Sequence, residues 1–369
     1  MKKREKENPL KEQVESKKKT SIGGQALMEG IMMRGPKMTA MAVRDRHGNI
    51  VIEERETKGA TRPKFCRLPI IRGILGYIDS MTVGYKCLMR SAVLAGLEDM
   101  VEQPDDEKND GWTRVTPEGA EPAPKKEQAE GTEAPATPQE KKKEEKKLPK
   151  WAMTQMTVLS LVLSLVIVIG VFVRLPIFLY SLLPIGDTGS AALNSLIKSA
   201  IEGVIKIALL VGYMAVISLM KDIRRTFMYH GAEHKTIFCY EAGLPLTVEN
   251  VRKQRRFHPR CGTSFLILML IVSIFTSFFI DPISIAIGGQ VLPDALRVIV
   301  KLALIPLIVG VGYELIKLAG RHDNLLTKII SAPGVWLQHV TVFEPTDDMI
   351  ECAIAAVRRV IPDDGSDNW

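Results

Sequence analysis

Two long runs without a single charged residue constrain this chain more than any other feature. The first run covers 22 residues, 152–173, and the second covers 19 residues, 262–280. An α-helix rises about 1.5 Å per residue, so either run can cross a hydrocarbon core of roughly 30 Å. The runs therefore predict an integral membrane protein.

Two further apolar segments predict additional membrane helices. Residues 196–220 are interrupted by Glu202 and Lys206, which lie one helical turn apart and can pair. Residues 296–319 contain Pro306 and carry charges toward their ends. We predict about four transmembrane helices, and we interpret Glu202 and Lys206 as a structural pair, with a transport function as the alternative.

The distribution of basic residues predicts the orientation of these helices. Residues 221–261 contain nine lysines and arginines, whereas the connections at 184–194 and 281–294 contain none. The positive-inside rule therefore places 221–261 and both chain termini in the cytosol. We expect a multi-pass protein of the cell membrane.

Two polar segments are predicted to lack a fold of their own. Residues 1–20 are rich in lysine, and residues 101–149 consist mainly of Glu, Lys, Pro, Ala and Gln. Neither has enough large apolar residues to form a core. We expect a disordered basic N-terminus and a disordered charged linker.

Residues 21–100 predict a small cytosolic unit. Two short strands around a glycine-containing turn predict a β-hairpin at 39–55. Residues 70–97 predict an amphipathic helix, which could lie in the head-group layer or pack on other helices. The glycine-containing stretches 23–30 and 33–36 match no nucleotide-binding motif and predict tight turns.

The overall prediction is a mainly α, integral membrane fold that includes a small β-hairpin and ends in a helix starting near Thr346. In chain order the predicted parts are the N-terminus (1–20), the hairpin with the amphipathic helix (21–100), the linker (101–149), transmembrane helices 1 and 2 (150–220), a His/Cys-bearing basic segment (221–261), transmembrane helices 3 and 4 (262–320) and a cytosolic C-terminal segment (321–369).

Cysteine count and net charge limit the environment and the partners. Five cysteines at irregular spacing do not make a disulfide framework, and no cleaved secretory signal is expected, so a reducing compartment is predicted. A net charge of +7 fits anionic membrane lipids as neighbours. Nucleic acid is not expected as a partner, because no aromatic residues interleave the basic ones. A protein partner or substrate in the membrane is compatible with this location.

The segment 229–235 carries the pattern His-x-x-Glu-His. If it is helical, His230 and His234 lie one turn apart on one face, where two imidazoles can bind one metal ion. Glu233 then stands where the inverted zinc-hydrolase motif has its general base. Gly231 opposes this prediction, because glycine weakens a helix by about 1 kcal/mol relative to alanine.

A second cluster lies at the entrance to the third span. His258 and Cys261 are on the same predicted cytosolic side as His230 and His234, and together they would make a tetrahedral His3Cys set for zinc or another divalent transition metal. Four protein ligands make a structural site and three leave a position for catalysis. Glu233 favours catalysis. The alternative is that these side chains pack in a basic segment without metal.

Four other residues are ligand candidates by location alone, since no spacing supports them. These are Glu241, Glu314, His322 and His339.

Several motifs resemble those of the YqhQ-like family of bacterial membrane proteins. They are GGQALMEGIMMRGP (23–36), YHGAEHKTI (229–237), LTVENVR (246–252) and HPRCGTSFL (258–266). The resemblance extends over most of 21–360 apart from the linker. It implies a metal-dependent membrane protein of a Gram-positive-type bacterium, with His230, Glu233, His234, His258 and Cys261 in its site, and it names no substrate. The run 340–345 departs from the family's more polar pattern, which weakens His339 as a ligand.

The function predicted first is a zinc-dependent membrane hydrolase, a peptidase being one candidate, with its site at the cytosolic face. His230 and His234 would bind the metal, His258 or Cys261 would complete the set, and Glu233 would accept a proton. The competing hypothesis is a non-enzymatic scaffold or assembly factor with a structural zinc site. A lipid or ion transporter ranks third.

Overall fold

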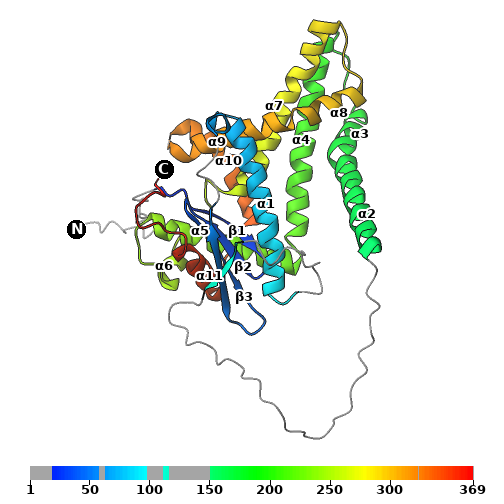
Figure 1. Cartoon of the computed structure of the whole chain (residues 1–369). Coiled ribbons are helices and arrows are strands. Elements are labelled where there is room, and N and C mark those ends of the chain that lie inside the picture. The colour runs from blue at the N-terminus through cyan, green and yellow to red at the C-terminus, as the bar shows by residue number, and fades with distance from the viewer. Residues whose placement is uncertain (1–18, 58–62, 98–110, 116–149, 323, 369) are drawn as a thin grey trace, which may run out of the picture.

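A computed structural model describes residues 19–57, 63–97, 111–115, 150–322 and 324–368. Long apolar helices form one part of the molecule, and a small sheet covered by helices forms the other (Figure 1). Residues 1–18 of the predicted N-terminus, and 101–110 and 116–149 of the predicted linker, lie outside the described residues.

The sheet has five antiparallel strands in the order β1-β2-β3-β4-β5. Its strands are β1 (Gly23–Leu27), β2 (Gly30–Arg34), β3 (Met38–Arg44), β4 (Ile50–Glu56) and β5 (Thr113–Val115). The predicted hairpin at 39–55 is confirmed as β3 and β4. The prediction of tight turns at 23–30 and 33–36 is confirmed in part: Met28 and Glu29 make the turn between β1 and β2, and the chain turns again after Arg34, but the other residues of these stretches form the two strands.

Strand β2 escaped prediction because both of its faces are buried. Ile31 and Met33 pack into the core on one face, while Met32 packs with Met41 into a second cluster on the other. A strand buried on both sides shows no alternation of apolar and polar residues. The sequence signal for a half-buried strand was therefore missing.

Strand β5 lies within the predicted linker, so the prediction of disorder is wrong for residues 111–115. It pairs with β4 through Ile52, Glu53 and Glu54. Beside it, the guanidinium of Arg55 lies 4.8 Å from the ring centroid of Trp112. A strand of three residues is stable only when it pairs with the edge of a sheet, here β4. Its own sequence does not indicate that partner.

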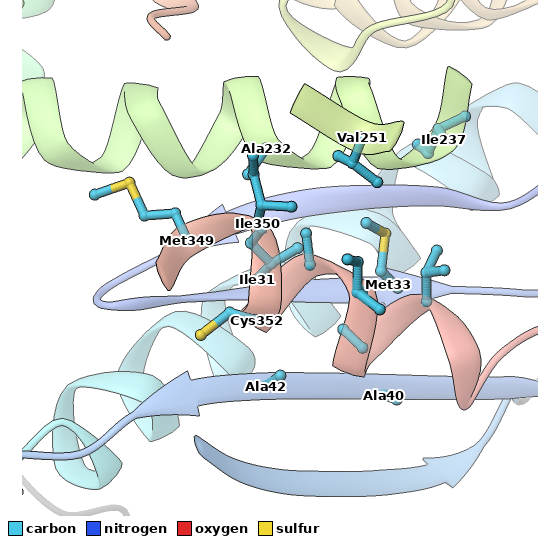
Figure 2. Packing of buried hydrophobic residues seen from close by; sticks show 14 of the residues in the cluster. Ile31, Met33, Ala40, Ala42, Ala232, Ile237, Val251, Met349, Ile350 and Cys352 are labelled. Carbon is cyan, nitrogen blue, oxygen red and sulfur yellow. The ribbon is translucent and has the colours of Figure 1, made fainter. Parts of the chain in front are cut away.

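The main core lies between the sheet and three helices, α5 (Lys221–Glu241), α6 (Val248–Arg252) and α11 (Asp347–Arg358). Figure 2 shows α11 inserted between α5 and the strands, with Ile350 and Met349 directed into the cluster. A fully buried side chain of this size contributes about 1.5–3 kcal/mol. The predicted C-terminal helix is thereby confirmed as a central part of the core.

Helix α1 (Ile71–Leu94) is the predicted amphipathic helix, and it packs on protein. It covers the other face of the sheet and contacts α9 (Ile305–Arg321). Its charges face partners from those elements: Arg72 pairs with Glu314, and Asp79 pairs with Arg34 at 2.5 Å. The amphipathic helix is confirmed, and these two charges of the helix pair with side chains of the protein.

Within the part of the chain that the structure describes, three helical stretches are long and apolar enough to cross a membrane: Val158–Ser181, Ala191–Ile217 and Gly262–Gly288. The first combines α2 (Lys150–Ile169), a π-helical turn (Gly170–Arg174) and α3 (Leu175–Ser181). The second is α4 and the third is α7. These stretches match the first three predicted spans, although α7 extends to Gly288 and places Asp281 inside the helix, where a loop was predicted.

The fourth predicted span is broken. Helix α8 (Asp294–Ala303) and α9 are bent by 48° at a break beside Pro306, and together they meet the same criteria of length and hydropathy. The pair runs antiparallel to α7, since Arg297 contacts Asp281 at 2.5 Å and Gly312 approaches Met269. The end of α9 therefore returns to the beginning of α7.

The polar pair inside α4 is confirmed. Glu202 and Lys206 lie 3.8 Å apart, and Lys301 of α8 approaches the same carboxylate at 3.9 Å. A second cation thus faces Glu202.

Candidate functional site

Helix α5 presents His230, Glu233 and His234 to the interior of the sheet unit. The segment is helical, which meets the condition for the two histidines to share a face, and all three side chains are buried, with His234 only 1% exposed. The helix continues through Gly231. Glycine is needed at this position because the backbone carbonyl of Phe343 packs directly against it, where a side chain would be. A side chain at this position would separate α5 from residues 343–345.

Cys261 comes from a different element, the N-terminal end of α7. It precedes the first residue of the helix and accepts a hydrogen bond from the Thr263 N–H at 3.4 Å. Its Sγ lies 3.0 Å from His230 Nε2. One ligand atom each from His230, His234 and Cys261 can be chosen so that all three lie within 4.8 Å of one another. The structure therefore brings together three of the four predicted ligands.

The two imidazoles are oriented as in metal sites. His230 Nδ1 lies 3.0 Å from the carbonyl of Thr341, and His234 Nδ1 lies 2.5 Å from the carbonyl of Arg256. A carbonyl only accepts, so each Nδ1 carries the proton and each Nε2 keeps its lone pair. Metal-binding histidines usually have such a partner on the other nitrogen. His234 Nε2 is buried and has no hydrogen-bond partner among the described residues, so the group fits a metal ion.

The electrostatics of Cys261 also suit a metal ligand. Burial opposes ionisation of the thiol, but the interaction with His234 and the hydrogen bonds to Thr263 outweigh it and lower the pKa of Cys261. The thiolate is the form that binds metals. Burial and the neighbouring His230 lower the pKa of His234, although Cys261 opposes this change.

Glu233 is held beside this group by strand β1. Burial, together with the nearby Cys261, raises the pKa of the Glu233 carboxyl to about 7, although His230 and a hydrogen bond from the Gly24 N–H oppose the rise. Its Oε2 has no hydrogen-bond partner among the described residues. A Cβ on Gly24 would lie 2.9 Å from Glu233 Cδ, so the close approach of β1 requires glycine. The carboxyl is thus ready to exchange a proton near neutral pH.

His258 does not join the three ligands, which corrects the predicted His3Cys set. Its ring centroid lies 5.5 Å from that of His234, but its Nε2 faces the Glu241 carboxylate at 3.9 Å and Arg260 at 3.3 Å. The pKa of His258 is lowered overall, because the effect of burial exceeds the opposite effect of the hydrogen bond to Glu241. The His258 side chain, which sequence spacing assigned to the metal, therefore contacts the buried pair of Glu241 and Arg260.

The remaining ligand candidates also stay outside the group. Glu314 pairs with Arg72, and His339 is exposed with its ring centroid 4.5 Å from that of Phe257. His322 ends α9 and lines a separate cavity. None of these side chains reaches the three ligands.

Gln338 belongs to the site and was not predicted. It lies on α10 (Leu325–Thr341), a helix that the sequence analysis missed and that contains Pro333. Its side chain accepts from the His258 N–H and donates to the His258 carbonyl, both at 2.7 Å. A glutamine near the end of an apolar segment gives no signal in the sequence that it will fix a loop 80 residues earlier.

We expect Gln338→Leu to lower the free energy of unfolding by about 1–3 kcal/mol, because it leaves the His258 N–H buried without its partner and leaves the His258 carbonyl with only the longer bond, 3.4 Å, from the Cys261 N–H among the described residues. The measurement is thermal unfolding of the full chain in detergent. Gln254→Leu is the control, since the Gln254 side chain donates, within the described chain, to the carbonyl of Asn250 four residues earlier and to no other group. Equal melting temperatures for the two variants would contradict the expected role of Gln338.

A cavity of about 140 Å³ adjoins the group. Its lining includes Gly24, Glu233, His234, His258 and Cys261. Polar and apolar groups both line this space, and it is large enough for water molecules. A small reacting group could therefore reach both the ligands and the carboxyl.

Fold and site define a class: a mostly helical protein with helices long enough to cross a membrane, and a small antiparallel sheet beside a His/His/Cys group. The chain belongs to the family described as "Protein of unknown function (DUF1385)", which matches residues 68–363. It is 32% identical to "Uncharacterized protein YqhQ" of Bacillus subtilis (strain 168) over 346 residues, covering 92% of each chain. No solved structure matches. The resemblance to YqhQ-like proteins is confirmed, while the metal dependence that it implied stays a prediction.

Proposed function

We propose that this protein is a membrane-embedded, zinc-dependent hydrolase with its site at the cytosolic face. The observation that carries the proposal is the buried group of His230, His234 and Cys261, with Glu233 beside it. Two nitrogens and one sulfur suit zinc, and other divalent transition metals bind such ligands too.

The number of ligands favours a catalytic site over a structural one. Structural zinc sites are closed by four protein ligands, whereas catalytic sites have three and leave one position open. The side chain that could have closed this site, His258, is engaged by Glu241 and Arg260. The cavity next to the group offers room for a reactant at the open position.

The chemistry divides between the metal and the protein. A bound zinc ion would supply a Lewis acid that activates water and polarises a carbonyl. Glu233 would accept the proton of the attacking water and pass it to the leaving group. A pKa near 7 suits this task, because a general base works best when its pKa is close to the working pH.

A peptide is one candidate substrate. Strand β1 is an edge strand of the sheet, and its Gly23 and Gly24 line the cavity. Extended peptides commonly bind by adding a strand to such an edge. The peptide bond would then lie close to Glu233.

The membrane placement rests on the apolar helices and the basic segment. Positive charge between α4 and α7 orients that segment and the sheet unit toward the cytosol. The two ends of the described chain meet on this unit, where Thr20 bridges to Asn368. Both termini would therefore be cytosolic.

The first test is the metal content of detergent-purified protein, measured by mass spectrometry. We expect about one zinc per chain in the wild type and at least a tenfold loss in the double variant His230→Ala, His234→Ala. His258→Ala is the matched control and should keep its metal, because His258 is not a ligand. Folded wild-type protein without stoichiometric metal would overturn the hydrolase and the structural-zinc hypotheses together.

A transporter is the second candidate, and one observation favours it. Glu202 and Asp281 are buried in the apolar helices α4 and α7, and one oxygen of each has no hydrogen-bond partner among the described residues. Ionisable groups at such depth often mark ion pathways. This hypothesis would lead if the metal measurement failed.

A further inference from the structure

A second cavity, of about 510 Å³, lies between the end of α9, the inner side of α10 and residues 255–260. Cavities of about 300–1,000 Å³ are typical of small-molecule sites. His258 and Arg260 line both this cavity and the smaller one at the metal group. The two spaces are therefore neighbours that share one wall.

The lining of this cavity is strongly cationic. It includes Lys19, Arg255, Arg260 and Lys328, and the carboxylate of Glu241 is the one acidic group among the described lining residues. Glu241 is already engaged: Arg260 donates to it, and so does the Thr20 N–H at 2.9 Å. The cavity thus has an excess of positive charge that suits an anion.

Arg255 is available to such an anion. It forms no ion pair with any residue that the structure describes, and its guanidinium lies 4.2 Å from the ring centroid of Phe238. Stacking on an aromatic face leaves the N–H donors of an arginine free to bind phosphate oxygens, often two at a time. Arg255 therefore combines a ring contact with donors that no described residue uses in an ion pair.

Apolar side chains form a further part of the lining, beside a few neutral polar ones. Phe257, Ala319, Ala332 and Val335 contribute to it. A small inorganic anion would leave these surfaces uncovered. An amphiphile, with a charged head and an apolar portion, would satisfy both kinds of wall.

Helix α10 also exposes an apolar surface next to the cavity. Leu325 is 74% exposed and Trp336 is 61% exposed, with Ile329 between them on the same side of the helix. Lys328 and Val335 of the same helix line the cavity. Tryptophan and leucine on a helix at the end of the apolar bundle are typical of contact with the lipid interface.

We propose that this cavity binds the phosphate group of an anionic phospholipid drawn from the cytosolic leaflet. Because α9 returns to the beginning of α7, the cavity lies at the level where the apolar helices meet the basic segment. Lipid phosphates are found at that level. The proposal rests on the membrane placement given above, and it does not depend on the metal.

The experiment measures binding to the purified full chain in detergent by isothermal titration. The probes are dihexanoyl phosphatidylglycerol, dihexanoylglycerol without a phosphate, and inorganic phosphate. The test variant is the double substitution Arg255→Gln, Lys328→Gln. The control is Lys253→Gln, Arg358→Gln, which removes the same charge from the sheet unit outside the cavity.

We expect the double variant to bind the phosphatidylglycerol probe roughly 30-fold more weakly than the wild type, while the control binds normally. Dihexanoylglycerol should not bind measurably. Inorganic phosphate binding as tightly as the lipid, with the same dependence on the variant, would overturn the lipid source in favour of a soluble phosphate. Equal lipid affinity in wild type and double variant would overturn the site itself.

Metal content measured on the same samples separates this proposal from the hydrolase. The double variant should keep its zinc, since Arg255 and Lys328 are not ligands. Lipid binding without metal would leave the cavity proposal standing and remove the hydrolase.

Discussion

The variant Glu233→Gln is expected to keep its metal and to lose hydrolytic activity by a factor of about 10²–10⁴, the usual contribution of a general base. Glutamine has nearly the same shape, and its side-chain oxygen can still accept from the Gly24 N–H. It cannot take a proton from water. The three ligands His230, His234 and Cys261 are unchanged, so binding of the metal should survive.

The measurement compares membranes of a deletion strain that expresses either the wild type or Glu233→Gln. Peptide termini and lipids are profiled by mass spectrometry, and products that appear only with the wild type identify the substrate. Glu249→Gln is the matched control, because Glu249 lies on the exposed surface of α6 and, among the described residues, pairs with Lys253 alone, at 2.6 Å. Full function of Glu233→Gln in the deletion strain would favour the scaffold with a structural site.

A second large effect is expected from Gly231→Ala, which should destabilise the protein although alanine has the higher helix propensity. In an isolated helix the change would stabilise by about 1 kcal/mol. Here the new methyl group would overlap the backbone carbonyl of Phe343 and lie 3.3 Å from Pro345 Cδ. Backbone cannot move aside as a flexible side chain can, so we expect a loss of about 3 kcal/mol or more in the free energy of unfolding.

Thermal unfolding in detergent measures this effect. Gly212→Ala in α4 is the control, because nothing lies within 4 Å of the place where its Cβ would be. It should leave the melting temperature unchanged or raise it slightly. A rise of similar size in Gly231→Ala would show that residues 343–345 do not pack on α5 as described.

The apolar helices were the part of the fold most readily predicted from the sequence. A run of charge-free residues is a local signal, so 152–173 and 262–280 fall within observed helices. Their ends were less predictable. The run at 262–280 gave no reason to continue past Asp281, because the partner that accommodates this charge, Arg297, lies in another helix.

The sheet was only partly predictable. The β3–β4 hairpin has a turn signal around Gly48, where φ is +86°. Strand β1 begins with two glycines, and both faces of β2 are buried. Neither strand therefore shows the alternation of apolar and polar residues that marks a half-buried strand. Strand β5 is specified by pairing with β4, which lies some 60 residues earlier in the chain.

The site shows the same division between local and distant information. Helical spacing predicted that His230 and His234 share a face, and Cys261 was predicted from its position at the entrance to the third span. Sequence spacing could not show that Glu241 and Arg260 would engage His258. It also could not show that Gln338 would hold the backbone of His258, since that contact spans 80 residues.

The interleaving of the chain in the core has a consequence for biosynthesis. The main cluster unites Ile31 of the sheet, Ala232 of α5 and Ile350 of α11, so its last contributor leaves the ribosome after every apolar helix has been made. Until then the inner face of the sheet stays uncovered, and it would be prone to aggregate or to bind a chaperone. The sheet unit can therefore be completed only after the whole series of apolar helices has been translated. Products that end before Met349 should be sensitive to proteolysis.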